Sequence, residues 1–205
     1  GKLVPQDPKE GTAEDLYKKI QSESASTESI KASSVESSEF PFEIPKNWKW
    51  AKGQRLFRVI RGVTYAKDEA ADHQKEGFIP LFRGHNIQEN GLNQDRLVYV
   101  GSKLISKEQM IKGGDIIIAM SSGSKNLVGK AAQASRSMVS SFGAFCSVIR
   151  PSTDYIQTYI GFIFSTPYYR SMIALAGRGI GINNLTVGAL NDFLIPLPPL
   201  AEQKR

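Results

Sequence analysis

Apolar residues recur at helical spacing in two parts of the chain. The first part is residues 13–20, which follow two prolines, and this pattern predicts a turn and then a short amphipathic helix. The second part is residues 156–163, where four apolar side chains share one helical face. Just beyond this helix, Thr166 and Pro167 are typical of the start of another helix, and Gly177 is placed to end that later helix.

Shorter apolar runs predict buried strands. The runs at 77–82 and 115–120 have the length of a strand and are too short for a core helix. Residues 129–135 and 144–151 are typical of a strand pair joined by a turn. Residues 193–199 predict a last strand that ends in prolines, which cannot continue a ladder of hydrogen bonds.

The spacing of Leu56, Val59 and Ile60 predicts a short helix after an entry segment that contains Trp48. Most of the large aromatic side chains and the single cysteine are expected in the core, with Cys146 buried and inert. The aromatic residues expected there are Trp48, Trp50, Phe142, Phe145, Phe162, Phe164, Tyr168 and Tyr169. These elements predict a mixed α/β or α+β fold, with one globular domain built on a mixed sheet with flanking helices.

A change in composition separates the first helix from this domain. Residues 23–39 are rich in Ser and Glu with almost nothing to bury, which predicts a flexible Ser-rich linker. We therefore divide the chain into a helical segment at 1–22, the linker at 23–39, a domain at 40–199 and the start of another helix at 200–205.

Length and composition narrow the class of protein. A chain of 205 residues with 40% hydrophobic residues can form one good-sized core. It has no apolar run of membrane-spanning length and no signal peptide, so a cytoplasmic protein without membrane association is expected. One cysteine and two scattered histidines argue against a disulfide or a structural zinc site. Because the chain starts without Met and stops where a helix begins, we expect a fragment of a longer polypeptide.

The net charge of +6 is distributed unevenly. Residues 1–44 carry 5 Lys and 9 acidic residues, for a net charge of −4, whereas residues 45–205 carry 21 Lys or Arg and 11 acidic residues, for a net charge of +10. A basic excess of this size in the domain favours a polyanionic partner, although many basic domains bind none.

The segment GDIIIAMSSGSKNLVGKAA superficially suggests a phosphate-binding P-loop. A P-loop needs four residues between its first Gly and the Gly-Lys, followed by Ser or Thr for Mg²⁺. Here Gly123 and Gly129 enclose five residues, and Ala131 stands where the hydroxyl is needed. The loop is therefore not predicted to bind a nucleoside triphosphate.

Catalytic motifs have little support. Asp192 and the Glu-Gln-Lys at 202–204 superficially match a metal-dependent nuclease, but that triplet follows two prolines and lies in a predicted helix. A methyltransferase motif of the Asn-Pro-Pro-Tyr type is missing from the sequence, and two scattered histidines form no nucleophile and base pair. An enzyme that acts alone on nucleic acid is thus the weakest of the functions considered.

Three polar loops are better candidates for binding. Gly frees the backbone for a close approach, and Arg, Lys, Asn and Gln are the side chains that reach base edges or phosphates. Ordinary turn chemistry is the alternative for any one such loop. The DNA-binding candidates are Arg83, His85, Asn86 and Gln88 in the first loop, Ser122, Ser124, Lys125, Asn126 and Lys130 in the second, and Arg178, Asn183 and Asn184 in the third. Arg55, Arg58 and Arg61 could track phosphates or form the solvated face of a helix.

Several segments together resemble a known family. FLIPLPPLAEQKR resembles the end of a target recognition domain and the start of the following helix in specificity subunits of type I restriction-modification enzymes. GKLVPQDP with AEDLYKKIQ resembles the end of that family's central helical region, before the second recognition domain. IPKNWKW, the Gly-Ser loop segment and SFGAFCSVIRP resemble the entry and middle of such a domain.

This resemblance implies a non-catalytic module for reading double-stranded DNA. In that family, a specificity subunit reads a split target, modification subunits bring S-adenosylmethionine to methylate adenine, and a restriction subunit uses ATP and Mg²⁺ for translocation and cleavage. The present chain would bind none of these cofactors itself and would read one half-target. The resemblance leaves open whether the whole protein has two recognition domains or dimerises. The alternative function is a protein-interaction scaffold without base readout.

Overall fold

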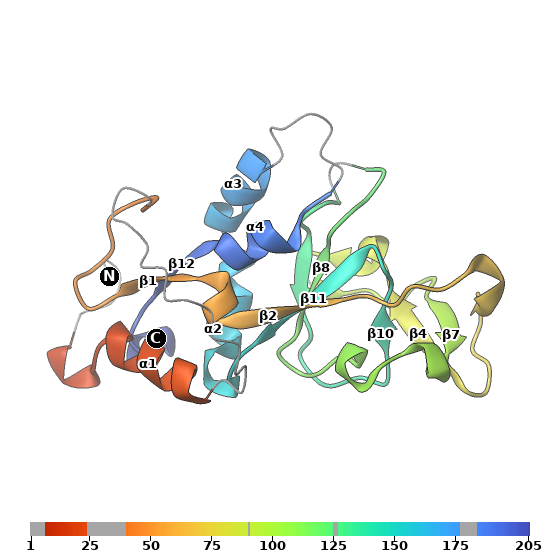
Figure 1. The fold of residues 1–205 in the computed structure, drawn as a ribbon, viewed down its shortest axis with the longest axis horizontal. Helices are drawn as coiled ribbons and strands as arrows, with labels where there is room; N and C mark the ends of the chain where they lie inside the picture. The colour runs from red at the N-terminus through yellow and green to blue at the C-terminus, as the bar shows by residue number, and fades with distance from the viewer. Residues whose placement is uncertain (1–6, 24–39, 90, 125–126, 177–183) are drawn as a thin grey trace.

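The computed structural model describes residues 7–23, 40–89, 91–124, 127–176 and 184–205. Figure 1 shows that these residues form an elongated molecule, with helices α1 and α5 at one end and strands β4 and β7 at the other. Between the two ends lies a four-stranded sheet with a buried apolar cluster against each of its faces. The described part of the chain is mixed helix and sheet, as the sequence predicts.

The end that holds both α1 and α5 is closed by a two-stranded ribbon. Strand β1 (Lys49–Lys52) pairs antiparallel with β12 (Leu194–Leu197), so that the first and last strands of the domain lie together. Helix α1 (Ala13–Glu23) buries Ala13, Leu16 and Ile20, and α5 (Leu200–Gln203) follows β12 directly.

The central sheet is entirely antiparallel, with the strand order β2-β11-β8-β9. Its strands are β2 (Phe57–Arg61), β11 (Cys146–Pro151), β8 (Ile116–Ala119) and β9 (Ala131–Gln133). Every residue of β8 and β11 is buried, because apolar layers cover both faces of the sheet.

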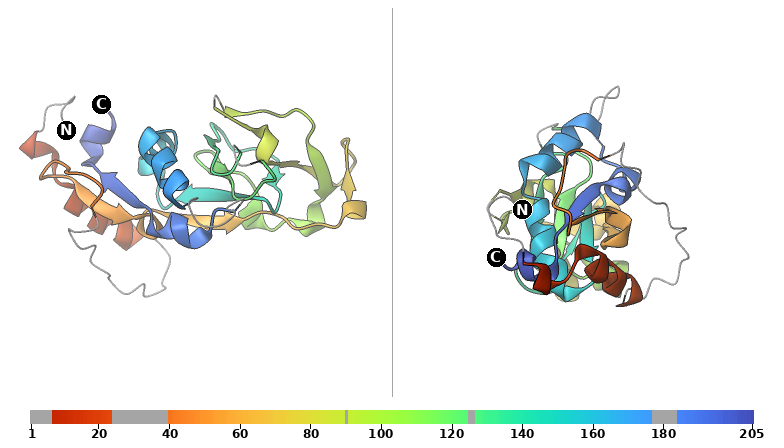
Figure 2. Two further views of the ribbon diagram at one scale, coloured as in Figure 1. Left: turned by 90° about the horizontal axis from the view of Figure 1, so that it is seen from above. Right: turned by 90° about the vertical axis from the view of Figure 1, so that its left-hand side faces the viewer.

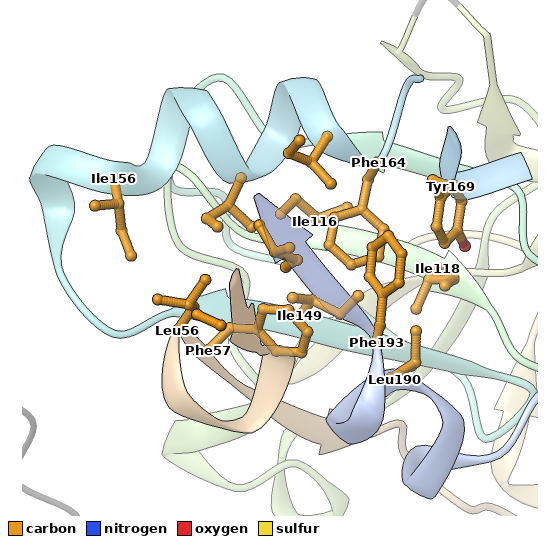
Figure 3. Close-up of a cluster of buried hydrophobic side chains, with 14 of the residues drawn as sticks. Leu56, Phe57, Ile116, Ile118, Ile149, Ile156, Phe164, Tyr169, Leu190 and Phe193 are labelled. Atoms are coloured by element: carbon orange, nitrogen blue, oxygen red, sulfur yellow. The ribbon is translucent and has the colours of Figure 1, made fainter. Parts of the chain in front are cut away.

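The larger apolar layer lies against helices. Ile116 and Ile118 of β8 face it, together with side chains from α2 (Gln157–Ile163), α3 (Pro167–Ala176) and α4 (Val187–Asp192). Figure 3 shows Phe164, Tyr169 and Phe193 gathered over Ile118 in this layer. Rings of Phe164 and Tyr169 lie 4.7 Å apart between centroids, a separation at which aromatic pairs are favourable.

The opposite face of the central sheet packs on a second set of strands. Ile117 and Ala119 of β8 contact a cluster with Phe82 and Phe142, as expected for alternating side chains. The second sheet has the order β10-β4-β7-β3, and only its β10–β4 pair is parallel. Its strands are β10 (Ser141–Phe142), β4 (Phe78–Phe82), β7 (Val98–Gly101) and β3 (Ala70–Ala71). A small ribbon joins β5 (Ile87–Gln88) to β6 (Gly91–Leu92).

Several predicted elements are confirmed. The helices over 13–20 and 156–163, the strands within 77–82, 115–120 and 193–199, and the helix start at 200 are all present. Thr166 Oγ1 accepts a hydrogen bond from the Tyr169 amide at 3.3 Å, which is the predicted cap of α3. The predicted helix end at Gly177 and most of the linker at 23–39 lie outside the described residues.

The helix predicted from Leu56, Val59 and Ile60 is wrong. A short 3-10 helix (Gly53–Arg55) precedes Leu56, and the residues after it form strand β2. Apolar spacing favours a helix only where no other strand pairs with the backbone. Here β11 pairs with all five residues of β2, from Pro151 opposite Phe57 to Ser147 opposite Arg61. β-Branched Val59 and Ile60 also suit a strand.

Two further expectations are corrected. Residues 129–135 and 144–151 do contain strands β9 and β11, but the two do not pair, because the more apolar β8 lies between them and bonds both. Phe145 and Phe162, expected in the core, are 71% and 62% exposed. By contrast, Trp50, Phe142, Phe164 and Tyr169 are buried, and so is Cys146.

Candidate nucleic-acid interface

Two of the three predicted loops meet beyond the end of β8. Ser121 and Asn184 form an isolated antiparallel bridge, and the Leu185 amide donates to the Met120 carbonyl at 2.6 Å. Residues more than 60 positions apart in the sequence are thereby held side by side, and the third loop returns to the domain at the point where the second begins. The structure therefore brings Asn184 next to the loop that holds Ser122 and Ser124.

The turn before β11 joins the same surface. The amides of Met120 and Ser121 both donate to the Phe145 carbonyl, at 2.9 and 3.2 Å. The Gly143 amide donates to the Phe82 carbonyl at 2.9 Å, and Phe82 directly precedes the first predicted loop. Backbone hydrogen bonds thus link the first and second loops through residues 143–145, and the third loop joins them at its contact with residues 120–121. We call this assembly the loop surface: residues 83–88, 121–124, 143–145 and 184.

A buried tyrosine anchors the second loop at its base. The Tyr169 hydroxyl donates to the Gly129 carbonyl at 2.7 Å, and the Gly129 amide donates to the Ala119 carbonyl at 2.8 Å. Burial raises the pKa of the Tyr169 hydroxyl, which keeps it a neutral donor. Gly129 has a φ of 77°, and a Cβ there would meet Ile173 at 2.8 Å. The loop therefore rises from a base that is fixed to the core.

Asn86 supports the first loop from inside. It is fully buried, accepts a hydrogen bond from the Arg83 amide at 2.9 Å and donates to the Asp95 carbonyl at 2.8 Å. A side chain that bonds two backbone groups in this way cannot also reach a base edge without breaking them. The expectation that Asn86 projects toward a partner is thus corrected: it shapes the loop.

The other residues of the first loop are partly buried. Gln88 donates from Nε2 to the His85 carbonyl at 2.7 Å, and Arg83 donates from Nη2 to the Arg96 carbonyl at 3.3 Å. Arg83 Nε and His85 Nε2 are buried and have no hydrogen-bond partner in the described part of the chain. Buried polar atoms without a partner are uncommon in folded proteins.

The second and third loops offer the more exposed groups. Ser124 and Asn184 are exposed, and Ser122 Oγ accepts a hydrogen bond from the Ser124 amide at 3.0 Å. Lys130 is half-buried, just before β9. Lys125, Asn126, Arg178 and Asn183 lie outside the described residues.

The three arginines spaced by three do not form a row. Arg58 and Arg61 lie on strand β2, where residues separated by an odd number point to opposite faces. Arg58 pairs with Glu108 at 2.8 Å, and Arg55 bonds Gln21 of α1 at 3.4 Å. Because residues 57–61 form a strand, the alternative that these arginines form the solvated face of a helix is also wrong.

The residues that mimic a nuclease motif serve structural roles. Asp192 pairs with Lys52 at 3.3 Å, and buried Glu202 accepts a hydrogen bond from Trp48 Nε1 at 2.8 Å. The Gly-Lys of the apparent P-loop leads into strand β9, whereas a P-loop leads into a helix. Within the described ranges, no group of three His, Cys, Asp or Glu residues could hold a metal ion.

Sequence reasoning missed one feature of the loop surface, the exposed ring of Phe145. A pocket of about 420 Å³ lies beside it, with Tyr65, Arg83 and Gly143 among its lining residues. The Gly143-Ala144 pair before Phe145 is the only local signal of a turn, and the apolar residues that follow it favour a strand.

No helix in the described part of the chain has the length and apolar character to span a membrane.

These observations define the class of the protein as a mixed helix and sheet domain, basic in charge, that holds polar loops together beyond the end of a central strand. The comparisons specify the family. Residues 45–205 match the family model described as the type I restriction modification DNA specificity domain. The chain therefore belongs to this family, in agreement with the resemblance found in the sequence.

Among curated proteins, the chain is similar to the specificity subunit of the type I restriction enzyme EcoKI from Escherichia coli K12, with 40% identity over 162 residues. It is 38% identical over 162 residues to the StySPI specificity subunit of Salmonella potsdam. Each alignment covers 79% of this chain and 35% of the relative. The chain thus spans about a third of the length of these relatives.

The fold is also similar to solved structures. The HsdS subunit from Thermoanaerobacter tengcongensis superposes with a TM-score of 0.57 at 17% identity, covering 94% of this chain and 41% of that one. A type I restriction-modification S subunit from M. genitalium gives a TM-score of 0.52 at 12% identity, with 94% and 43% covered. These likenesses concern the fold.

Proposed function

We propose that this chain is a target recognition domain, which reads one half of a split double-stranded DNA target. The observation that carries this proposal is the convergence of the predicted loops, held together by the Ser121–Asn184 bridge in a member of the DNA specificity family. Such a domain performs no chemistry itself and directs the enzymes bound to it.

Affinity and specificity would come from different residues. The basic excess of residues 45–205 would neutralise phosphates, with Lys125 and Lys130 of the second loop among the contacts. The amide and guanidinium side chains would discriminate between bases, since Asn, Gln and Arg can bond base edges in pairs. For that role we propose Gln88, Asn126, Arg178, Asn183 and Asn184, with the serine hydroxyls and His85 adding further hydrogen bonds.

In the whole protein, the partners would be modification subunits, which use S-adenosylmethionine, and a restriction subunit, which uses ATP and Mg²⁺. The arrangement of α1 and α5 supports a domain that is inserted between helical spacers. Arg205 donates to both carboxylate oxygens of Glu10, at 2.7 and 2.6 Å, so residues at the two ends of the chain are in contact. Figure 2 shows α1 and α5 at one end of the molecule, away from the loop surface. The spacers would then leave the loop surface clear for DNA.

The alternative, a protein-interaction scaffold, predicts a different salt dependence. We would titrate a labelled target duplex with the full-length protein and its modification subunits at rising salt. Binding through phosphates makes the logarithm of the association constant fall by about 0.9 per contact per decade of salt. Lys130→Ala should weaken binding to all sequences alike and reduce the slope by about 1.

Lys18→Ala is the matched control, because it removes the same charge from the exposed face of α1. It should leave the slope unchanged. A complex that binds duplex without a salt slope, or not at all, would favour the scaffold function.

A further inference from the structure

The pocket beside the loop surface has two walls of different origin. One wall is the segment that follows β2, including Val63 and Tyr65, and the other is the turn at residues 143–146. The two walls are held together by a parallel bridge between Val63 and Gly143 and by a hydrogen bond from the Val63 amide to the Phe142 carbonyl, 2.8 Å long. Its volume of about 420 Å³ is in the range of sites that hold a small organic molecule.

The lining combines aromatic rings with cations. Tyr65 and Phe145 provide rings, Lys67 and Arg83 provide positive charge, and the remaining walls include small apolar side chains such as Ala144. A bare anion would gain little from such apolar walls, and a purely apolar ligand would make no use of the two cations. The chemistry fits a flat, apolar ring joined to a negative group.

Phe145 is placed to receive such a ring. Its side chain is 71% exposed, although its backbone carbonyl is fixed by two hydrogen bonds from Met120 and Ser121. A large exposed aromatic side chain on a fixed turn is a ready stacking platform, because it loses little conformational freedom when a partner covers it.

Arg83 lines the same pocket. Its Nε is buried with no hydrogen-bond partner among the described residues, and its charge lies close enough to Cys146 to oppose the raised pKa of that thiol. Arg83 thus lines the pocket, and part of the hydrogen-bonding capacity of its guanidinium is unused.

We propose that this pocket holds one nucleotide that is unstacked from the bound DNA, with its base against Phe145 and Tyr65 and its phosphate near Arg83 and Lys67. This inference rests on the proposed function, since the DNA must lie on the loop surface. Aromatic side chains and cations together are the usual means of holding an unstacked nucleotide. The pocket would then contribute to specificity without base-edge contacts, because the free energy needed to unstack a nucleotide depends on the DNA sequence around it.

Mismatched duplexes test the proposal. A mismatch lowers the cost of unstacking a base, so it should tighten binding if it lies at the position that enters the pocket. We would measure binding of the full-length protein with its modification subunits to target duplexes that carry one mismatch at successive positions. At one position, the wild-type complex should bind the mismatched duplex several-fold more tightly than the matched duplex.

Phe145→Ala should abolish that gain and weaken binding to the matched target by about 5- to 150-fold, the effect of losing one base stack. Phe145→Tyr should retain the gain. Phe162→Ala, which removes a similarly exposed ring from α2, is the matched control and should behave as wild type. Because both phenylalanines are exposed, all three variants should keep the wild-type melting temperature.

The outcomes separate this proposal from the function on which it rests. If wild type binds DNA with a salt slope but gains nothing from any mismatch, the pocket proposal is overturned and the function stands. If wild type binds no DNA, both fail. If Phe145→Ala leaves DNA binding intact but weakens assembly with the modification subunits, the pocket is a protein contact and the proposal is wrong.

Discussion

Arg150 donates two hydrogen bonds to the buried carboxylate of Asp115, from Nε at 2.7 Å and from Nη2 at 2.6 Å. Arg150 lies on β11, and Asp115 directly precedes β8. Arg150 also donates to the carbonyls of Glu108 and Met110, at 3.1 and 2.9 Å. It therefore ties the central sheet to the chain that connects it to β7.

Removing one partner of this pair should destabilise the domain. Asp115→Ala leaves a buried guanidinium without its counter-charge, and the expected loss is about 3 to 5 kcal/mol of unfolding free energy. The double variant Asp115→Leu with Arg150→Met should recover part of that loss, because it removes both charges. Urea denaturation measures both values. Equal destabilisation by the single and double variants would contradict this account of the pair.

Gly62 permits the close approach of the two pocket walls. A Cβ at this position would meet the Gly143 carbonyl oxygen at 2.1 Å and the Phe142 carbonyl oxygen at 2.8 Å. Gly62→Ala should therefore separate the walls and cost about 1 to 3 kcal/mol of unfolding free energy. Gly101→Ala is the control, since its Cβ would meet nothing within 4 Å, and it should change stability by less than about 0.5 kcal/mol. Similar unfolding curves for both variants would refute the close approach.

Substitution of Asn86 should change stability, whereas substitution of Asn184 should change DNA specificity. Asn86→Ala leaves the Arg83 amide and the Asp95 carbonyl unpaired, so it should lower the unfolding free energy by about 1 to 3 kcal/mol. Asn184→Ala alters an exposed side chain and should leave stability within about 0.5 kcal/mol of wild type. It should instead relax preference at one base pair, by about 1 to 3 kcal/mol.

Thermal unfolding combined with binding to a set of singly substituted targets distinguishes these effects. If Asn184→Ala keeps full discrimination at every base pair, Asn184 is not a reading residue.

Stability should fall at alkaline pH. Burial raises the pKa of the Cys146 thiol from 9.0 to about 12 and that of the Tyr168 hydroxyl from 10.0 to about 12, and it raises those of Tyr159 and Tyr169 as well. The unfolded chain therefore loses these protons first. These groups should leave the unfolding free energy unchanged near pH 8 and lower it between about pH 9 and 12, by at most about 1.4 kcal/mol per pH unit for each group.

Denaturation at several pH values checks this prediction, and Cys146→Ala should make the decline between pH 9 and 11 less steep. An unfolding free energy that stays level up to pH 11 would show that these groups ionise equally in both states.

The sequence predicts local elements well where one apolar pattern decides them, as for Leu16 and Ile20 of α1 or the isoleucines of β8. It fails where a distant partner decides. The strand at residues 57–61 exists because β11 pairs with it, and β11 and β9 are separated because β8 pairs with both. Pairing between segments far apart in the chain leaves no local signature.

The candidate binding surface follows the same rule. Residue types led us to propose the three loops, and the structure places described residues of the second and third loops side by side. Residue types were not sufficient to rank the residues within a loop. Asn86 and Asn184 have the same chemistry, yet one is buried under a loop and the other is exposed. Phe145 has the apolar side chain expected of a core residue, and it is exposed because it lies in the turn before β11.

A domain exchange tests the central claim most directly. In a host that carries the matching modification subunits, residues 40–199 of the full-length protein would be replaced by the corresponding domain of a relative. Methylated adenines would then be mapped across the genome by long-read sequencing. We predict that one half of a split motif changes while the other half persists. A motif that stays unchanged in both halves would contradict the assignment of this segment as a recognition domain.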